Sequence, residues 1–469
     1  MNVSHVLVKP ERRRKEIAYA WLISYGPPAI VATASILLVG RLFRLISRYA
    51  VNIFFWDEWD LKNVTLFQTN SLWQMFAWQH GWHRLGLGAL LEKLLNPLFQ
   101  WNSRTESFLL GGILAVTAIF VLWLKTRLYG RFSIFDVVIP AILFTPAQWE
   151  TLYITPIFSQ GPLPFFLIVA YCLAWTCERS ALRYPVVLLI NFVTIYTGFG
   201  IFLGVITPVL LALDYWSQPF PKSLTRACFI AALVISLASL GSFFLGYKLT
   251  PGISCFSEFQ PSSLRSYMAF AALIEANFFA LRTTGTFPRF VGATVFIALL
   301  TSLLCAVSVL VRRNAVKVPK SEHARLLVVT ALTAVSATSC ATIAYLRLCA
   351  GLQTALSPRY AVYVQLGILG LYFHLLGLRN TWSRRCLLTV LLVLLVVSSL
   401  HSDREAMVYL RDNKQRWKTC YLQIEDIKQC NDITGFVIYP PPAEHTRLHE
   451  KLQYLKKARQ NLYLDQKTP

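Results

Sequence analysis

The stretch IAYAWLISYGPPAIVATASILLVG, residues 17–40, decides the fold. It has no charged side chain over about 24 residues, which is long enough for one helix to cross the roughly 30 Å hydrocarbon core of a bilayer. It is also longer than the apolar region of a cleavable signal peptide, so we expect it to stay in the mature protein. Ten similar runs, some only about 15 residues long, follow at 107–124, 132–147, 160–176, 184–197, 199–214, 227–247, 290–311, 326–346, 360–378 and 386–401.

The composition supports this interpretation. Hydrophobic residues make up 55% of the chain and charged residues only 14%. A soluble domain has about 25% charged residues, so this chain has too little polar surface to cover its apolar side chains. Within lipid, a helix satisfies all its backbone donors and acceptors inside one segment. We therefore predict an all-α protein, a polytopic bundle of about eleven transmembrane helices.

The distribution of basic residues predicts the orientation. The net charge is +22, but Lys and Arg do not form one basic patch with interleaved aromatic residues, so we expect no nucleic-acid partner. They occupy every second connection between apolar runs, which places the N-terminus in the cytoplasm and the C-terminal tail outside. The basic connections are Lys9 to Lys15, Lys125 to Arg131, Arg179 to Arg183, Lys222 to Arg226, Arg312 to Arg325 and Arg379 to Arg385.

Two segments depart from this pattern. Arg41, Arg44 and Arg48 lie at the outer end of the first apolar run, against the usual bias. The run from Leu264 to Leu281 is apolar but interrupted by Glu275. We expect it to form a short interfacial or re-entrant helix, because a full crossing would place the later basic clusters outside.

A change in composition near residue 401 divides the chain. Residues 1–401 hold the apolar runs, whereas residues 402–469 mix charges of both signs. We predict a multi-span membrane domain followed by a small extracytoplasmic cap, α-rich and too small for a core of its own. In an oxidising compartment Cys420 and Cys430 would form a disulfide. Two free thiols are the alternative, and the sequence does not decide between them.

An acidic motif follows the first apolar run directly. Asp57, Glu58 and Asp60 lie between Trp56 and Trp59. Carboxylates this close raise at least one pKa and need a cation or a proton nearby. Either the motif is an interfacial turn whose acids face water, or it supplies a general base or a metal-binding carboxylate at the membrane surface. We take the three acids as candidate catalytic residues.

A second polar motif contains two histidines. His80 and His83 are three residues apart and would share one face of a helix. Imidazole together with carboxylates suits a divalent ion such as Mg²⁺ or Mn²⁺. Flanking tryptophans favour the alternative, in which both residues belong to an interfacial aromatic belt.

The remaining candidates are residues that suit recognition of a phosphate. Arg44 contacts either anionic lipid headgroups or a substrate phosphate. Arg359 follows a proline at the start of a late apolar run, opposite a glycine-containing loop that permits close approach of a phosphate. The candidate substrate-binding or lipid-phosphate-binding residues are Arg359, Tyr360, Arg84, Arg44, Trp149 and Glu150.

These motifs, in this order, resemble the C-fold (GT-C) glycosyltransferase superfamily. Its members include protein O-mannosyltransferases and the aminoarabinose transferase of lipid A, and an acidic motif in the first outer loop is typical of them. The resemblance is closest to uncharacterised bacterial multi-span members. The segments that carry it are Asp57-Glu58-Trp59, Trp78 to Arg84, Trp149-Glu150, Gly198 to Gly200 and Ser357 to Tyr360. The chain departs at Gly81-Trp82, where that group often has Asn-Glu, and in its short cap, which leaves acceptor recognition open.

The resemblance implies a function and roles. An inverting transferase of this type moves a sugar from a polyprenyl-phosphate donor to a hydroxyl of a glycan, lipid or protein at the outer face. Asp57 would deprotonate the acceptor, Glu58 would assist or hold a metal, and Arg359 would neutralise the departing phosphate. The implied location is a bacterial inner membrane, with the site facing the periplasm.

A lipid or glycan transporter without transferase chemistry is the alternative function. Gly198 to Gly200 would fit a broken helix of such a protein. The chain has no Walker motif, no Gly-rich dinucleotide fingerprint, no nucleophile elbow and no HExxH motif, so ATP-driven transport, dinucleotide chemistry and zinc proteolysis have no support.

Overall fold

The computed structural model describes residues 10–67, 71–217, 223–248, 263–312, 320–401, 403–440 and 447–465. Over these ranges the regular structure is helical, apart from one hairpin formed by β1 (Gln79–His80) and β2 (His83–Arg84). The all-α bundle predicted from the apolar runs is therefore confirmed at this level.

Each predicted apolar run falls on a helical segment of the bundle. The run at 132–147 is broken into η3 (Ile134–Val137), α6 (Val138–Leu143) and η4 (Pro146–Gln148). The other runs lie on α1 (Pro10–Tyr49), α5 (Ser103–Tyr129), α7 (Pro162–Trp175), α8 (Ser180–Ile195), α9 (Ile201–Trp216), α10 (Ser223–Phe243), α12 (Thr286–Arg312), α13 (Lys320–Arg347), α14 (Ala361–Leu376) and α15 (Thr381–Leu400).

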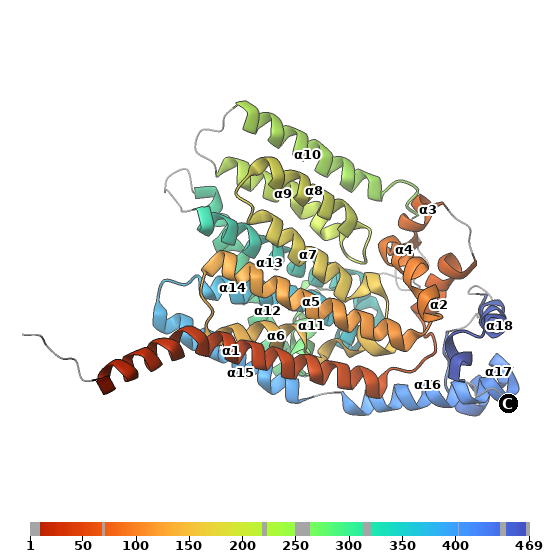
Figure 1. The fold of residues 1–469 in the computed structure, drawn as a ribbon. Helices are drawn as coiled ribbons and strands as arrows, with labels where there is room; N and C mark the ends of the chain where they lie inside the picture. Colours follow the sequence, from red (N-terminus) through yellow and green to blue (C-terminus); the bar gives the residue numbers. More distant parts are fainter. Residues whose placement is uncertain are drawn as a thin grey trace, which may run out of the picture.

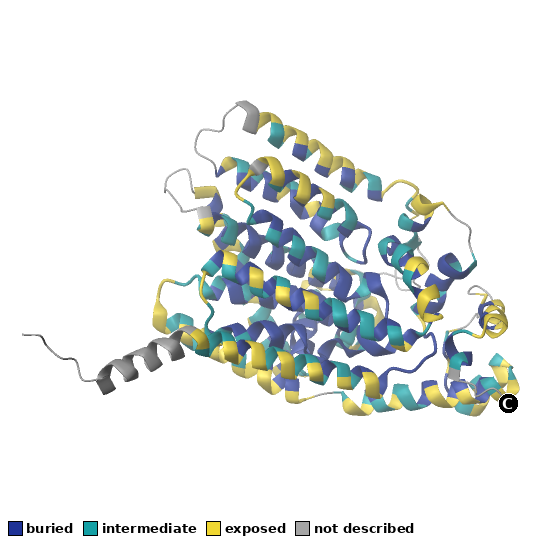
Figure 2. Ribbon diagram, in the orientation of Figure 1, coloured by how far each residue is buried: buried dark blue, intermediate teal, exposed yellow. Residues whose placement is uncertain are grey.

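Among the described residues, 6 helices are long and apolar enough to cross a membrane. They are Tyr25–Tyr49, Ser103–Tyr129, Arg226–Phe243, Thr286–Arg312, Ser321–Ala350 and a segment from Thr381 that runs on into the cap. Many apolar residues are nevertheless exposed, including Ile230 and Val234 on α10. Figure 2 shows exposed residues along the outer helices of the bundle. A soluble protein does not leave apolar surface of this extent in water, so these faces suit lipid. The number of crossings and their direction remain predictions.

The bundle has two chemically different ends. At one end the basic connections gather: the guanidinium of Arg325 lies over the ring of Tyr129, and His323 pairs with Asp214. At the other end lie the short helices α2 (Asp57–Lys62), α3 (Leu72–Phe76) and α4 (Gly86–Leu95), beside the C-terminal helices (Figure 1). The polar motifs of the sequence lie at this second end, which we call the site end.

Helix α11 (Leu264–Phe278) is the segment for which we expected an interfacial or re-entrant helix. The ring of Tyr267 stacks on that of Tyr345, and the side chain of Asn277 donates a hydrogen bond to the backbone oxygen of Ser357. Both ends of α11 are thus near residues of the site end. It is not among the helices long and apolar enough to span.

The C-terminal cap consists of α16 (Arg404–Ile424), α17 (Ile427–Thr434) and α18 (Leu448–Ala458), and it lies at the site end (Figure 1). Met407, Trp417 and Leu452 belong to the same hydrophobic cluster as the bundle helices, so the cap shares a core with the bundle. Cys420 and Cys430 form a disulfide, which decides between the two alternatives.

Candidate functional site

A cavity of about 360 Å³ opens at the site end. Segments far apart in the sequence line it: the acidic motif, the histidine hairpin, the turn between α8 and α9, the C-terminal end of α13 and the N-terminal end of α14. Its lining residues are Trp56, Asp57, His80, Gly81, Trp82, His83, Gln160, Gly198, Phe199, Ile343, Leu346, Arg347, Arg359, Tyr360 and Tyr363. Among the described residues of this lining, Asp57 is the one carboxylate, and Arg347 and Arg359 are the two arginines.

The acidic motif forms the first turn of α2. Trp56, the residue before it, has a φ of 50°, a conformation that side chains other than glycine rarely adopt. The chain is held there because the backbone N–H of Trp56 donates to the oxygen of Ile438 in the cap, at 2.9 Å. Such strain often accompanies a functional site. Here it turns Asp57 toward the cavity.

The histidines lie on a β-hairpin, so the prediction that they share one face of a helix is wrong. Gly81 and Trp82 form the two-residue turn, and Gly81 has a φ of 55°. His80 therefore pairs directly across the hairpin from His83. The hairpin is tied to the segment after α10 by two hydrogen bonds of the Gln79 side chain to the backbone of Lys248, at 2.7 and 2.9 Å.

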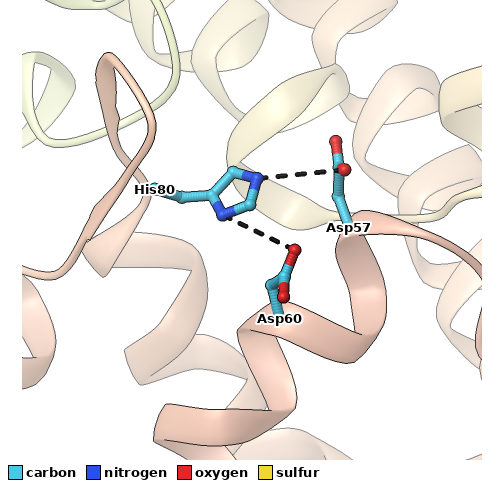
Figure 3. Close-up of side chains that lie close together, drawn as sticks. All are labelled: Asp57, Asp60 and His80. Atoms are coloured by element: carbon cyan, nitrogen blue, oxygen red, sulfur yellow. Dashed lines mark ion pairs between the residues drawn. The ribbon is translucent and has the colours of Figure 1, made fainter. Parts of the chain in front are cut away.

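His80 lies between two carboxylates, as Figure 3 shows. Its Nε2 is 3.8 Å from Oδ1 of Asp57, and its Nδ1 is 3.9 Å from Oδ2 of Asp60. Asp57 and Asp60 are three residues apart, so both project from the same side of α2. The like charges that the sequence placed together are compensated by one imidazole.

The electrostatics of this cluster follow from its geometry. Burial alone would raise the pKa of Asp57, but the neighbouring His80 and the charge of Arg359 outweigh it and lower that pKa to about 2. Burial alone would lower the pKa of His80, but the nearby carboxylates of Asp57 and Asp60 raise it above its ordinary value. Burial raises the pKa of Asp60, against the opposing effect of His80. Asp57 is thus ionised near neutral pH.

Arg359 is held at the cavity by an acid from another segment. Its Nε and Nη2 donate to Oε1 of Glu150 at 2.9 and 2.5 Å, and Ser357 donates to Oε2 of the same carboxylate at 3.1 Å. Nη1 of Arg359 is 3.8 Å from Oδ2 of Asp57. The two carboxylates raise the pKa of Arg359 although burial opposes them, so its charge is permanent. Asp57, Glu150 and Arg359, which the sequence named separately, belong to one network.

Arg347 is a site residue that the sequence reasoning missed. It ends α13 and lines the cavity, and it has no ion-pair partner among the described residues. A search for motifs could not find it, because no motif surrounds it. Gly198 is required for a different reason: its φ is 41°, and a Cβ there would be 2.6 Å from the backbone oxygen of Ser159. It joins α8 to α9 at a turn, so it does not mark a break within one helix.

Several other candidates lie outside the cavity. Glu58 is fully buried on another side of α2, where it accepts from the backbone N–H of Phe55 and the hydroxyl of Ser103. Burial raises the pKa of Glu58 to about 7, although Lys414 and Lys62 oppose the shift. Its contacts are those of a structural acid.

Arg84, Trp149 and Arg44 also lie outside the cavity lining. The guanidinium of Arg84 is buried and donates to the backbone oxygens of Ala77, Phe243 and Leu245, so it closes the end of α10. The indole N–H of Trp149 donates to Asp403 of the cap, at 2.7 Å. Arg44 is exposed on α1 and is not part of the cavity lining. A sequence shows that such residues are polar but not which backbone groups they satisfy.

The donor set for a divalent ion is Asp57, Asp60 and His80, whose ligand atoms lie within 4.8 Å of one another. Two carboxylate oxygens and one imidazole nitrogen suit Mn²⁺ or Mg²⁺. Both ring nitrogens of His80 face carboxylates, however, so an ion would have to replace at least one of these contacts (Figure 3). His83 is not in this set: its ring packs edge-on against Phe199, with 4.0 Å between centroids.

Comparison with known proteins adds no identification to this geometry. No protein-family model and no curated protein sequence matches the chain.

Proposed function

We propose that the protein is a membrane glycosyltransferase that moves a sugar from a polyprenyl-phosphate donor to an acceptor hydroxyl at the extracytoplasmic face. The observation that carries the proposal is the convergence of one ionised aspartate and two arginines on a single cavity at the end of an apolar bundle. Such a reaction needs a base for the acceptor and positive charge for the leaving phosphate, next to a place for a lipid tail.

The chemistry assigns a task to each group. The acceptor oxygen forms a bond to the anomeric carbon while the bond from that carbon to the phosphate oxygen breaks. The leaving lipid phosphate takes the electron pair, and Arg347 and Arg359 stabilise its growing charge. The acceptor proton passes to Asp57, which is ionised before the reaction. If Mg²⁺ or Mn²⁺ binds the acids, it would supply further positive charge.

The cysteines support a site end that faces an oxidising compartment. Cys420 and Cys430 of the cap form a disulfide, and Cys349, just after α13, is also disulfide-bonded. The free cysteines among the described residues lie in the bundle or near its basic end: Cys172, Cys177, Cys228, Cys305, Cys340 and Cys386. Disulfides persist in oxidising compartments, so this division agrees with an N-terminus in the cytoplasm and a periplasmic site in a bacterial inner membrane.

The test is Asp57→Asn, with Asp432→Asn as the matched control because Asp432 is an exposed acid of the cap. The purified protein, in nanodiscs, is offered undecaprenyl-phosphate sugars one at a time with a membrane extract as acceptor. We expect Asp57→Asn to lower transfer by at least about 100-fold and the control to keep it. A deletion strain that accumulates one lipid-linked sugar would identify the donor. Undiminished transfer by Asp57→Asn, or lipid movement across the bilayer with no transfer, would refute the proposal, and the second result would establish a transporter.

A further inference from the structure

A second cavity lies at the basic end of the bundle, opposite the site. Its volume is about 640 Å³. It is formed where the end of α5, the segment leading into η3, the end of α14 and the start of α15 meet. Its lining residues are Lys125, Tyr129, Arg131, Ser133, Ile134, Phe135, Leu376, Arg384, Arg385 and Leu388.

The charges of this cavity are not balanced by the described protein around it. Lys125 forms an ion pair with Asp136 at 2.7 Å, and Asp136 also accepts a hydrogen bond from Tyr372 at 2.5 Å. The carboxylate of Asp136 is therefore already paired with a cation. Among the described residues, Arg131, Arg384 and Arg385 have no ion-pair partner.

The position of two of these arginines makes the imbalance larger. Arg384 and Arg385 lie four and five residues after Asn380, the N-cap residue of helix α15, and the first turn of this helix contains no acidic side chain. The positive end of a helix dipole disfavours cations. Three guanidinium groups therefore face one cavity, two of them near the positive end of α15, and the described lining of the cavity contains no carboxylate.

Apolar side chains also line the cavity, and α15 carries further exposed apolar side chains. Phe135 and Leu388 line the cavity beside the arginines. Helix α15 also exposes apolar side chains: the accessible fraction is 45% for Leu387, 56% for Val390 and 37% for Leu394. A ligand that fits here combines an anion with a long apolar part.

We propose that this cavity binds an anionic glycerophospholipid, with its phosphodiester among Arg131, Arg384 and Arg385 and its acyl chains along α15. Basic pockets between helices on the cytoplasmic side recognise anionic headgroups in this way, and guanidinium groups bind phosphate oxygens in pairs. The inference uses none of the residues of the site end and does not depend on the transferase chemistry.

The test compares Arg384→Gln/Arg385→Gln with the control Arg179→Gln/Arg312→Gln, which removes two exposed arginines of the same end outside the cavity. Native mass spectrometry of the full chain measures bound lipid after addition of phosphatidylglycerol, phosphatidylcholine or inorganic phosphate. We expect phosphatidylglycerol to bind the wild type and the control, and to bind the double glutamine variant about tenfold or more weakly. Phosphatidylcholine should bind all three weakly.

The same experiment separates the alternatives. If the control loses as much phosphatidylglycerol binding as the double glutamine variant, the effect is one of general surface charge. If inorganic phosphate binds the wild type as well as phosphatidylglycerol does, the cavity is a site for free phosphate. Either result overturns the proposal. Arg384→Lys/Arg385→Lys keeps the charge but loses the paired N–H donors, so it should fold and bind with intermediate strength. If the double glutamine variant does not fold, Arg131→Gln makes the same comparison, and unchanged lipid binding there would overturn the proposal.

Discussion

Replacing Glu150 by Gln tests whether Arg359 must be held in a fixed direction. The substitution keeps the size of the side chain and removes its charge. The Arg359 guanidinium then loses its carboxylate partner, while Asp57 remains 3.8 Å away. We expect Arg359 to turn toward Asp57, which would weaken Asp57 as a base and leave the lipid phosphate less well neutralised.

The size of the effect follows from two hydrogen bonds. Nε and Nη2 of Arg359 donate to the same carboxylate oxygen at 2.9 and 2.5 Å. A hydrogen bond to a charged group contributes about 1.5–3 kcal/mol. The Arg359 side chain is 36% exposed, so solvent screening reduces the combined contribution to roughly 1.5 kcal/mol. This corresponds to about a tenfold loss of kcat/KM.

The assay is sugar transfer from the lipid-linked sugar that the deletion strain accumulates, and the control is Glu322→Gln. Glu322 pairs with Arg325 at 2.9 Å near the basic end, so the control removes another Glu–Arg pair at the opposite end of the bundle from the site cavity. Because charge on the phosphate grows in the transition state, kcat should fall more than KM rises. A kcat within twofold of the wild type, or an equal fall in the control, would refute the role of Glu150 in positioning Arg359.

Three further predictions concern pH and the cap. His80→Gln removes the imidazole whose positive charge helps to lower the pKa of Asp57 to about 2. The acid limb of the pH–rate profile should therefore move upward by about 1 unit or more, and an unmoved limb would contradict the assignment. The folded state holds the proton of Glu58 up to about pH 7, whereas the unfolded chain releases it near 4.5. The free energy of unfolding should therefore fall as pH rises through that window, by up to about 3.5 kcal/mol at about 1.4 kcal/mol for each pKa unit. Thermal unfolding in detergent from pH 4.5 to 8 should show this decline in the wild type and a smaller one in Glu58→Gln. Reducing Cys420–Cys430, whose sequence separation is 10, should destabilise the cap by about 3 kcal/mol, visible as faster proteolysis of α17.

The fold was predictable because an apolar run of sufficient length has few alternatives in lipid. Each run falls on a helical segment, since hydropathy alone determines that choice. The convergence of Asp57 and Arg359 was also expected, because alternate connections of a bundle meet at one end. The placement of Asp57 and Arg359 at the same end of the bundle follows from the order of the apolar runs alone.

The individual roles were less predictable, because they depend on contacts between distant segments. The spacing of His80 and His83 fits a helix, but the Gly81-Trp82 turn makes a hairpin and separates their environments. Arg84 looks like a phosphate ligand in the sequence, yet three backbone oxygens take its donors. Nothing in the local sequence distinguishes it from Arg347, whose guanidinium has no ion-pair partner among the described residues.

The part of the chain beneath the acidic motif explains how so short a helix keeps a fixed direction. Lys62, at the end of α2, is fully buried and pairs with Glu92 of α4 at 2.5 Å, while Glu106 of α5 is 3.9 Å away. Burial raises the pKa of Glu92, against the opposing charge of Lys62. A buried pair adds little net stability over apolar packing, but losing one partner costs about 3–5 kcal/mol, so the chain has few alternative positions for α2. The buried lysine thus fixes α2 to two other helices, and the carboxylate that faces the cavity stays aligned with arginines brought from about 300 residues farther along the chain.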